Sequence, residues 1–337
     1  MIYPNFIKEK DTIGVTAPSN GQTDRLDLLR IDNAYKKLKE LGYNIKETPN
    51  IRTSYKGRSS PARIRAKKLL DLYKDKDIKL IVSAKGGDFM IEILPYLDFN
   101  IIKNNPKWFQ GCSDNTILTY TITTNLDIAT IYGENISSYG MEPYHKSIEE
   151  NLDILTGKNL KQNSYPKYQD GFIDYKTGLE PIRLDKKVNW INLYNKDKIE
   201  IEGRLIGGCL DVIVDLIGTK YDKTKEFIEK YKKDGIIWYL ENFGLDNDAL
   251  FRKLTQLKYA GYFQYTKGII FGRTLTNTSY NDISYEESVS EALKDLNIPV
   301  IIETDFGHKP PRFTIINGSY TKISSSNGKG TIKYILK

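Results

Sequence analysis

The chain has 337 residues, of which 39% are hydrophobic and 28% charged, a composition typical of a globular protein rather than a disordered one. The 50 basic and 43 acidic residues give a net charge of +7, and because the lysines are mixed with acidic residues we expect no nucleic-acid and no membrane partner. The chain shows no apolar run of about 18 residues and no secretory signal at its start, which predicts a cytoplasmic protein. Cys112 and Cys209 are too few for a disulfide framework or a four-cysteine zinc site.

The first part of the chain alternates short apolar strands with helical segments. Strands are expected at 12–17, 44–48, 79–85, 108–111 and 128–134, and helices at 24–41, 60–75, 90–97 and 115–125. Because strand and helix alternate with short links, we predict a parallel α/β sheet, and we assign residues 1–156 to an N-terminal α/β domain.

Residues 157–198 are polar and have little periodicity, so we interpret them as a linker to a second domain at 199–337. In that domain helices are expected at 209–219, 223–234, 249–263 and 288–297, and strands at 235–241, 266–272, 299–305, 314–317, 320–325 and 331–336. The last strands follow one another closely, which favours antiparallel pairing at the end of the chain.

Ser113 falls at the predicted turn between the strand 108–111 and the following helix. Such a turn exposes the hydroxyl and directs the helix N-terminus at it, so the backbone N–H of Asp114 would face an oxyanion. The G-x-S-x-G elbow motif is half present, because Gly111 fits and Asn115 stands where the second glycine would be. From spacing alone, Ser113 or Asp114 acting only as a helix N-cap is the stronger interpretation.

Gly86 and Gly87 follow a predicted strand, where glycines let a ligand approach the backbone and offer N–H donors. A plain turn is an equal alternative. The Walker and G-x-G-x-x-G phosphate motifs are both absent.

Glu241 ends the apolar strand GIIWYLE, and His308 lies in a turn-rich segment before Pro310 and Pro311. The chain has only 2 histidines, the other being His145. A serine, a histidine and a carboxylate are the parts of a nucleophilic hydrolase. Taken singly, a glutamate such as Glu241 at a strand end is more often a surface residue, and a lone histidine such as His308 is more often structural than catalytic.

Taken together, several segments resemble the LD-carboxypeptidase family of serine peptidases, which includes the microcin C self-immunity hydrolases. They recur in order over nearly the whole chain: D-x-IGV-x-APS at 11–19, the glycine pair at 86–87, LPYLDF at 94–99, NPKWFQGCSD at 105–114, GG-x-L and L-x-GT within 207–219, LEN at 240–242 and DFGH at 305–308.

The resemblance implies a catalytic triad of Ser113, Glu241 and His308, and an oxyanion site made by the N–H groups of Asp114 and of the Gly87–Asp88 turn. It implies a Rossmann-like N-terminal domain, a smaller β-rich C-terminal α/β domain, a homodimer, and neither a metal nor an organic cofactor.

The chain departs from the family pattern at three places. Cys112 stands where an aromatic residue is common, Asp88 and Phe89 follow the glycine pair in place of an aromatic residue and a glycine, and residues 133–143 are closer to the immunity branch. Immunity hydrolases stack an aromatic residue on adenine, and Trp190 lies in a plausible region for that role.

The resulting hypothesis is acyl-enzyme hydrolysis of the L,D amide bond of a murein tetrapeptide, with release of D-Ala. Arg312, close to His308 in sequence, is a candidate to hold the terminal carboxylate. The alternatives are hydrolysis of a peptidyl- or aminoacyl-nucleotide, and a ligand-binding protein on the same scaffold without turnover. A nucleic-acid-binding module is a distant third.

Overall fold

The computed structural model describes residues 1–194 and 196–337. The chain is a mixed α/β protein, as predicted, and it divides into two compact units. The first unit comprises Met1–Asn159, Ile173–Ile182 and Thr314–Ile316, and the second comprises Leu160–Phe172, Arg183–Phe313 and Asn317–Lys337.

The first unit is built on a six-stranded sheet with the order β14-β5-β4-β3-β1-β2. Its strands are β1 (Thr12–Thr16), β2 (Asn44–Glu47), β3 (Ile78–Ser83), β4 (Trp108–Gly111), β5 (Thr130–Tyr132) and β14 (Ile315–Asn317). Strands β1 to β5 pair in parallel, and the central ones are buried along nearly their whole length. Continuous burial explains why these strands read as apolar runs rather than as alternating patterns.

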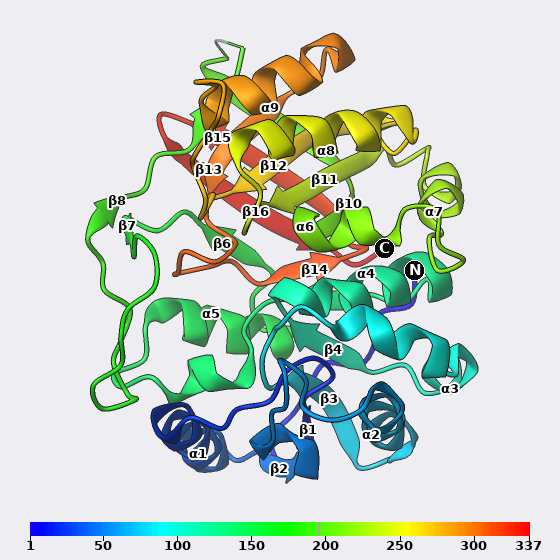
Figure 1. Ribbon diagram of the computed structural model, residues 1–337, viewed down its shortest axis with the longest axis vertical. Coiled ribbons are helices and arrows are strands. Elements are labelled where there is room, and N and C mark those ends of the chain that lie inside the picture. The colour runs from blue at the N-terminus through cyan, green and yellow to red at the C-terminus, as the bar shows by residue number, and fades with distance from the viewer. Residues whose placement is uncertain (195) are drawn as a thin grey trace. The chain divides into compact units, whose positions relative to one another are not determined.

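Figure 1 shows the helices of this unit around its sheet. They are α1 (Arg25–Glu40), α2 (Ala62–Lys74), α3 (Phe99–Asn104), α4 (Thr116–Leu126) and α5 (Lys146–Leu155), with 3₁₀ turns η1 (Pro49–Arg52), η2 (Met90–Tyr96), η3 (Ser113–Asn115) and η4 (Ile136–Gly140). The segment expected as a helix at 90–97 is the 3₁₀ turn η2, with Pro95 inside it. Proline lacks the N–H that a regular helix needs and favours such short turns.

The second unit contains an eight-stranded sheet with the order β6-β16-β15-β10-β11-β12-β13-β9. Its strands are β6 (Lys161–Asn163), β9 (Ile191–Asn192), β10 (Lys198–Cys209), β11 (Ile236–Glu241), β12 (Thr266–Gly272), β13 (Val300–Thr304), β15 (Tyr320–Ser326) and β16 (Lys329–Ile335). Strands β10 to β13 are parallel to one another, whereas β6, β9, β15 and β16 pair antiparallel. The expected antiparallel pairing at the chain end is therefore found in β15 and β16.

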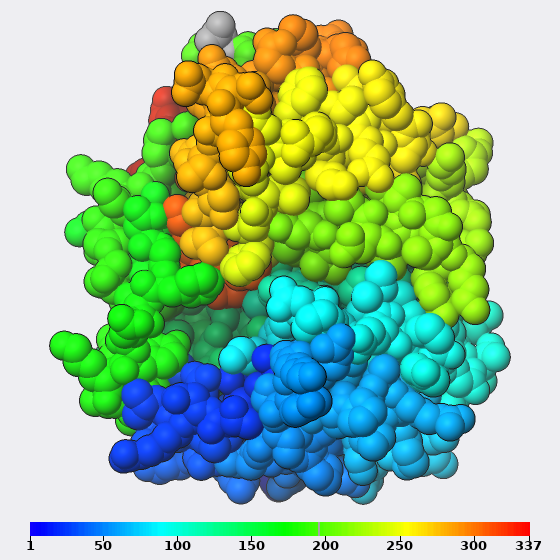
Figure 2. Space-filling view, viewed as in Figure 1, coloured from blue at the N-terminus to red at the C-terminus, as the bar shows by residue number. Residues whose placement is uncertain are grey.

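The helices of the second unit are α6 (Leu210–Ile213), α7 (Thr224–Lys230), α8 (Asn247–Tyr259) and α9 (Tyr285–Leu293), with 3₁₀ turns η5 (Val214–Leu216) and η6 (Lys294–Leu296). Figure 1 shows α8 and α9 side by side over the parallel strands, and in Figure 2 their side chains cover this face of the unit. No helix in the described part of the chain has the length and apolar character needed to cross a membrane.

The segment 157–198 differs from the expected linker. It contains β6, β9 and a separate antiparallel pair, β7 (Lys167–Tyr168) and β8 (Lys186–Lys187), so the second unit extends beyond the range 199–337. Strands of two or three residues are too short to show an alternating pattern. Likewise β14, expected as part of the C-terminal domain, is an edge strand of the first sheet.

Candidate active site

Strand β4 ends at Gly111, Cys112 follows it, and Ser113 is the first residue of η3. Its φ is +64°, in the left-handed region that non-glycine residues rarely adopt. Such a conformation costs on the order of 1–3 kcal/mol and is concentrated at functional sites. The Ser113 N–H donates to the hydroxyl of Tyr132 at 2.9 Å.

Two asparagines hold the backbone that leads into this turn. Asn115 Nδ2 donates to the Cys112 carbonyl at 2.9 Å and to the Lys85 carbonyl at 3.2 Å. The Cys112 N–H donates to Asn135 Oδ1 at 3.3 Å. Asn115, which occupies the place of the second glycine of an elbow motif, therefore holds the turn through its side chain.

The glycine pair packs directly against the serine. A Cβ on Gly86 would lie 2.8 Å from Ser113 Cβ and 3.0 Å from its Oγ, so only glycine fits there. Gly87 has φ +154°, and a Cβ on it would lie 2.4 Å from Ser19 Oγ. Within the described residues, the N–H groups of Gly87 and Asp88, which follow Gly86 directly, donate no hydrogen bond to another protein group.

Asp114 does not cap the helix. Its carboxylate accepts from the Ser19 hydroxyl at 2.5 Å and from the Met90 N–H at 2.9 Å. Burial raises the pKa of Asp114, while these two hydrogen bonds oppose the shift. The side chain thus ties the loop after β1 to the turn that carries Ser113, and the N-cap interpretation does not hold for this residue.

Glu241 and His308 form a hydrogen-bonded pair in the second unit. Glu241 ends β11 and is 1% exposed, so it is not a surface residue. His308 Nδ1 lies 2.8 Å from Glu241 Oε2. Gly307 has φ +99°, and a Cβ there would lie 2.6 Å from Glu241 Oε2, so the close approach depends on glycine. The ring of Phe243 packs on the imidazole with centroids 4.4 Å apart.

The loop that carries His308 is held by Arg273, which the sequence did not single out. Its Nη1 pairs with Asp305 Oδ1 at 2.7 Å, and its Nη2 donates to the carbonyls of Lys309, at 2.8 Å, and Pro311. The fully buried guanidinium therefore binds the loop on both sides of His308. In the sequence, only its partner Asp305, within the DFGH motif, belonged to a recognised segment. Arg273 follows β12, and its contact with the His308 loop arises because β12 pairs with β13.

Trp190 does not present a face for stacking. It is 3% exposed, its indole N–H donates to Asp305 Oδ2 at 2.7 Å, and its ring packs on that of Phe313 in a T-shaped arrangement. A stacking role on a nucleobase, raised from its sequence position, is therefore wrong for this residue in the structure; it supports Asp305 instead.

Two other residues were considered from the sequence, His145 and Arg312. His145 is the N-cap of α5, where its Nδ1 accepts the Ser147 N–H at 3.1 Å, a structural role. Arg312 is half-buried in the second unit. Across the described residues no group of three histidine, cysteine or acidic side chains is arranged to hold a metal.

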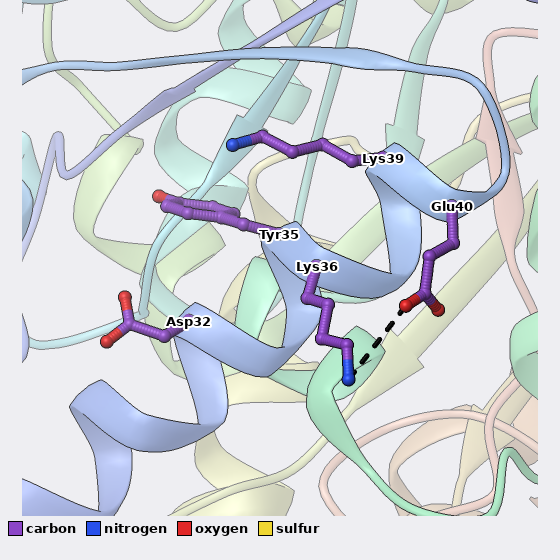
Figure 3. A pocket seen from close by; sticks show the side chains of 5 residues that line it. All are labelled: Asp32, Tyr35, Lys36, Lys39 and Glu40. Atoms are coloured by element: carbon purple, nitrogen blue, oxygen red, sulfur yellow. Dashed lines mark ion pairs between the residues drawn. The ribbon is translucent and has the colours of Figure 1, made fainter.

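Three cavities are lined by other residues. Figure 3 shows one on the outer face of α1, a hollow of about 580 Å³ lined by Asp32, Tyr35, Lys36, Lys39 and Glu40. A second, of about 620 Å³, lies over β6, β10, β15 and β16, and a third, of about 720 Å³, lies near the start of β1 and β3. None of these three contains Ser113, Glu241 or His308 in its lining.

The predicted site residues thus fall into two groups. Ser113, Asp114 and the Gly87–Asp88 turn belong to the first unit, and Glu241 and His308 belong to the second. Each group is assembled within its own unit from segments distant in sequence.

Two family models match the chain, one in each half. Residues 13–133 match the LD-carboxypeptidase N-terminal domain, and residues 202–323 match the LD-carboxypeptidase C-terminal domain. The chain therefore belongs to the LD-carboxypeptidase family of serine peptidases and is a hydrolase of that class.

Similar relatives carry two kinds of name. The microcin C7 self-immunity protein of Escherichia coli is 30% identical over 80% of this chain and 78% of its own. A Bacillus subtilis protein named probable murein peptide carboxypeptidase is 23% identical over 98% of this chain and 94% of its own.

Solved structures of the same family superpose over the whole chain. A relative of the self-immunity protein from Bacillus anthracis is 27% identical, with a TM-score of 0.84 and coverage of 100% of both chains. The self-immunity protein in complex with aspartyl sulfamoyl adenosine is 26% identical with a TM-score of 0.84, again covering 100% of both chains.

Proposed function

We propose that the chain hydrolyses an amide bond by an acyl-enzyme route, with Ser113 as nucleophile, His308 as general base and Glu241 as its partner. Three features support this: the strained Ser113 turn, the buried carboxylate bonded to His308, and the membership of a serine peptidase family. The His308–Glu241 hydrogen bond is the main support. The chain has only 2 histidines, and this one is paired with a buried carboxylate, as a catalytic base would be.

The hydrogen bond assigns the roles of the two imidazole nitrogens. When Nδ1 donates its proton to Glu241, Nε2 is the basic nitrogen and can take the proton of the Ser113 hydroxyl. His308 would then return that proton to the leaving amine, and Glu241 would stabilise the cationic imidazole between the two steps.

The oxyanion of the tetrahedral intermediate would be bound by the N–H groups of Asp114 and of Gly87 or Asp88. The Ser113 N–H is already donated to Tyr132, so it is not counted among these donors. Loss of one such donor raises a barrier by about 3 kcal/mol in well-studied serine hydrolases.

The proposed substrate is a murein tetrapeptide, cleaved at its L,D bond to release D-Ala. The name of the Bacillus subtilis relative supports this assignment. A carboxypeptidase must also bind the terminal carboxylate of its substrate, and Arg312 remains the candidate for that contact.

A second candidate substrate is an aminoacyl-nucleotide. It is favoured by the 30% identity to the self-immunity protein and by the structural match to that protein bound to aspartyl sulfamoyl adenosine. An aminoacyl sulfamoyl adenosine carries an N-acyl bond, so the same acyl-enzyme route would apply to it.

Turnover assays followed by mass spectrometry separate these two substrates. Purified protein is incubated with an L,D-linked murein tetrapeptide and, in parallel, with an aminoacyl sulfamoyl adenylate. We expect release of D-Ala from the tetrapeptide, abolished in Ser113→Ala. Cleavage of the adenylate alone would transfer the assignment to the second candidate, and turnover of either substrate by Ser113→Ala would contradict the mechanism.

A further inference from the structure

We propose that Tyr132 is a positioning residue for the nucleophile, a role that rests on the proposed function of Ser113. Tyr132 is the last residue of β5 and is 1% exposed. It pairs in register with Gly111, the last residue of β4, which brings its hydroxyl beneath the turn. There it accepts the Ser113 N–H at 2.9 Å.

The hydrogen bond matters because of the backbone at Ser113. A left-handed φ rotates the N–H of this residue away from the direction it would take in a continuing strand or helix. A buried N–H without an acceptor is unfavourable, so an acceptor at this point stabilises the left-handed conformation over its competitors. Tyr132 supplies that acceptor from a neighbouring strand.

The neighbouring asparagine side chains do not accept the Ser113 N–H. Asn135 accepts from the Cys112 N–H, and Asn115 donates to the Cys112 carbonyl, so both asparagines act one residue before the nucleophile. The Thr116 N–H donates to the Ser113 carbonyl, and the Tyr132 hydroxyl is the side-chain group that accepts the Ser113 N–H. The conformation of Ser113 decides where its Oγ lies relative to the oxyanion donors.

Because of this hydrogen bond, different N–H groups position the nucleophile and bind the oxyanion. The Ser113 N–H is used to fix the nucleophile, and stabilisation of the oxyanion is left to Asp114 and the Gly87–Asp88 turn. Loss of the Tyr132 hydroxyl should therefore misplace Oγ for attack while leaving the surfaces that bind the substrate unchanged.

Tyr132→Phe tests the proposal, with Tyr139→Phe as its matched control. Tyr139 is also 1% exposed in the first unit, and its hydroxyl accepts from Gln110 Nε2 at 2.8 Å and donates to Asn151. Both variants remove one buried hydroxyl, but only Tyr132 contacts the nucleophile. We expect kcat of Tyr132→Phe to fall on the order of 10- to 100-fold with KM unchanged, and Tyr139→Phe to retain kcat.

Further measurements give the same comparison without relying on one substrate. The rate at which a fluorophosphonate labels Ser113 should fall in Tyr132→Phe in parallel with kcat, and the pH–rate profile should keep its wild-type midpoints, since His308 and Glu241 are untouched. Amide hydrogen exchange of the wild-type protein should show a protected Ser113 N–H, which tests the contact even if Tyr132→Phe fails to fold.

The proposal is overturned if Tyr132→Phe keeps wild-type kcat, if it loses no more than Tyr139→Phe, if only KM rises, or if the Ser113 amide exchanges as fast as an unprotected one. Failure of the proposed function looks different: the wild type would turn over neither substrate, or Ser113→Ala would remain active.

Discussion

At the scale of single residues, two glycines lie so close to the proposed catalytic side chains that an added Cβ atom would clash with them. Gly86 gives Ser113 its space, and Gly307 lets the Glu241 carboxylate reach the backbone next to His308. Such positions can be tested by adding one methyl group, because the added atom has a known neighbour.

Gly307→Ala should impair catalysis more than folding. The new Cβ would lie 2.6 Å from Glu241 Oε2, displacing the carboxylate from His308, and we expect kcat/KM to fall on the order of 100-fold. Gly218→Ala is the control, because Gly218 also has a positive φ, +79°, yet has no atom within 4 Å of an added Cβ.

Steady-state kinetics and thermal unfolding of both variants distinguish the effect of backbone strain from the effect of displacing the Glu241 carboxylate. Both should lose stability by about 1–2 kcal/mol from the left-handed backbone. Equal loss of activity in the two variants would show that backbone strain, and not the position of Glu241, controls the rate.

Glu241→Gln should preserve the fold and slow the reaction. The amide fills the same space but lacks the charge that stabilises a protonated His308, so we expect kcat to fall on the order of 10³-fold or more. The exposed Glu202→Gln, on β10 of the same unit, is the isosteric control and should have wild-type kinetics. A Glu241→Gln enzyme with kcat within a factor of about 3 of wild type would remove Glu241 from the mechanism.

At the scale of elements, loops at the carboxyl ends of the parallel strands are held by buried or half-buried charges. Arg273 fixes the loop after β13, and Asp248, at the start of α8, fixes the loop after β12. The Asp248 carboxylate accepts from Ser279 Oγ at 2.7 Å, from the Tyr280 N–H at 2.9 Å and from Asn281 Nδ2 at 2.6 Å.

These contacts predict a pH dependence of stability. The hydrogen bond from Asn281, followed by those from Ser279 and Tyr280, lowers the pKa of Asp248 to about 2. A carboxyl with a lowered folded-state pKa contributes stability that is present above about pH 4 and is lost as the pH falls towards 2. Asp248→Asn should therefore flatten the decline of Tm between about pH 4 and 2.

Thermal unfolding across this pH range measures the effect. Asp282→Asn, in the same loop but outside these three contacts, should keep the wild-type slope. An unchanged slope in Asp248→Asn would show that this carboxylate does not govern the acid stability of the unit.

The sequence predicted the elements whose signal is local. The strands β1, β3, β4 and β11 and the helices α1, α2 and α8 have clear apolar runs or helical spacing, and they were found close to their observed bounds. The helix α5 was missed, and the expected helix 209–219 proved to be the short turns α6 and η5 after β10, before Gly218.

The site was predictable only in part, for the same reason. Ser113, Glu241 and His308 were proposed from strand ends and from a family resemblance, and the last two do form a hydrogen bond. Neither Tyr132 nor Arg273 was singled out from the sequence, because their roles depend on which strands lie next to one another. Sequence spacing does not specify such neighbours.

At the scale of the whole molecule, the chain matches both domains of one hydrolase family, and the residues proposed as a triad are divided between the two units. The relatives include a protein named for murein peptides and one named for microcin immunity. The proposed mechanism requires that His308 activates the hydroxyl of Ser113.

Covalent labelling tests this requirement most directly. Wild-type protein, Ser113→Ala and His308→Asn are treated with a fluorophosphonate, and the adducts are located and timed by mass spectrometry. We expect one adduct per chain, on Ser113, formed at least about 100-fold more slowly in His308→Asn because the base that activates the hydroxyl is lost. An adduct at another residue, or equal labelling rates in wild type and His308→Asn, would contradict the mechanism.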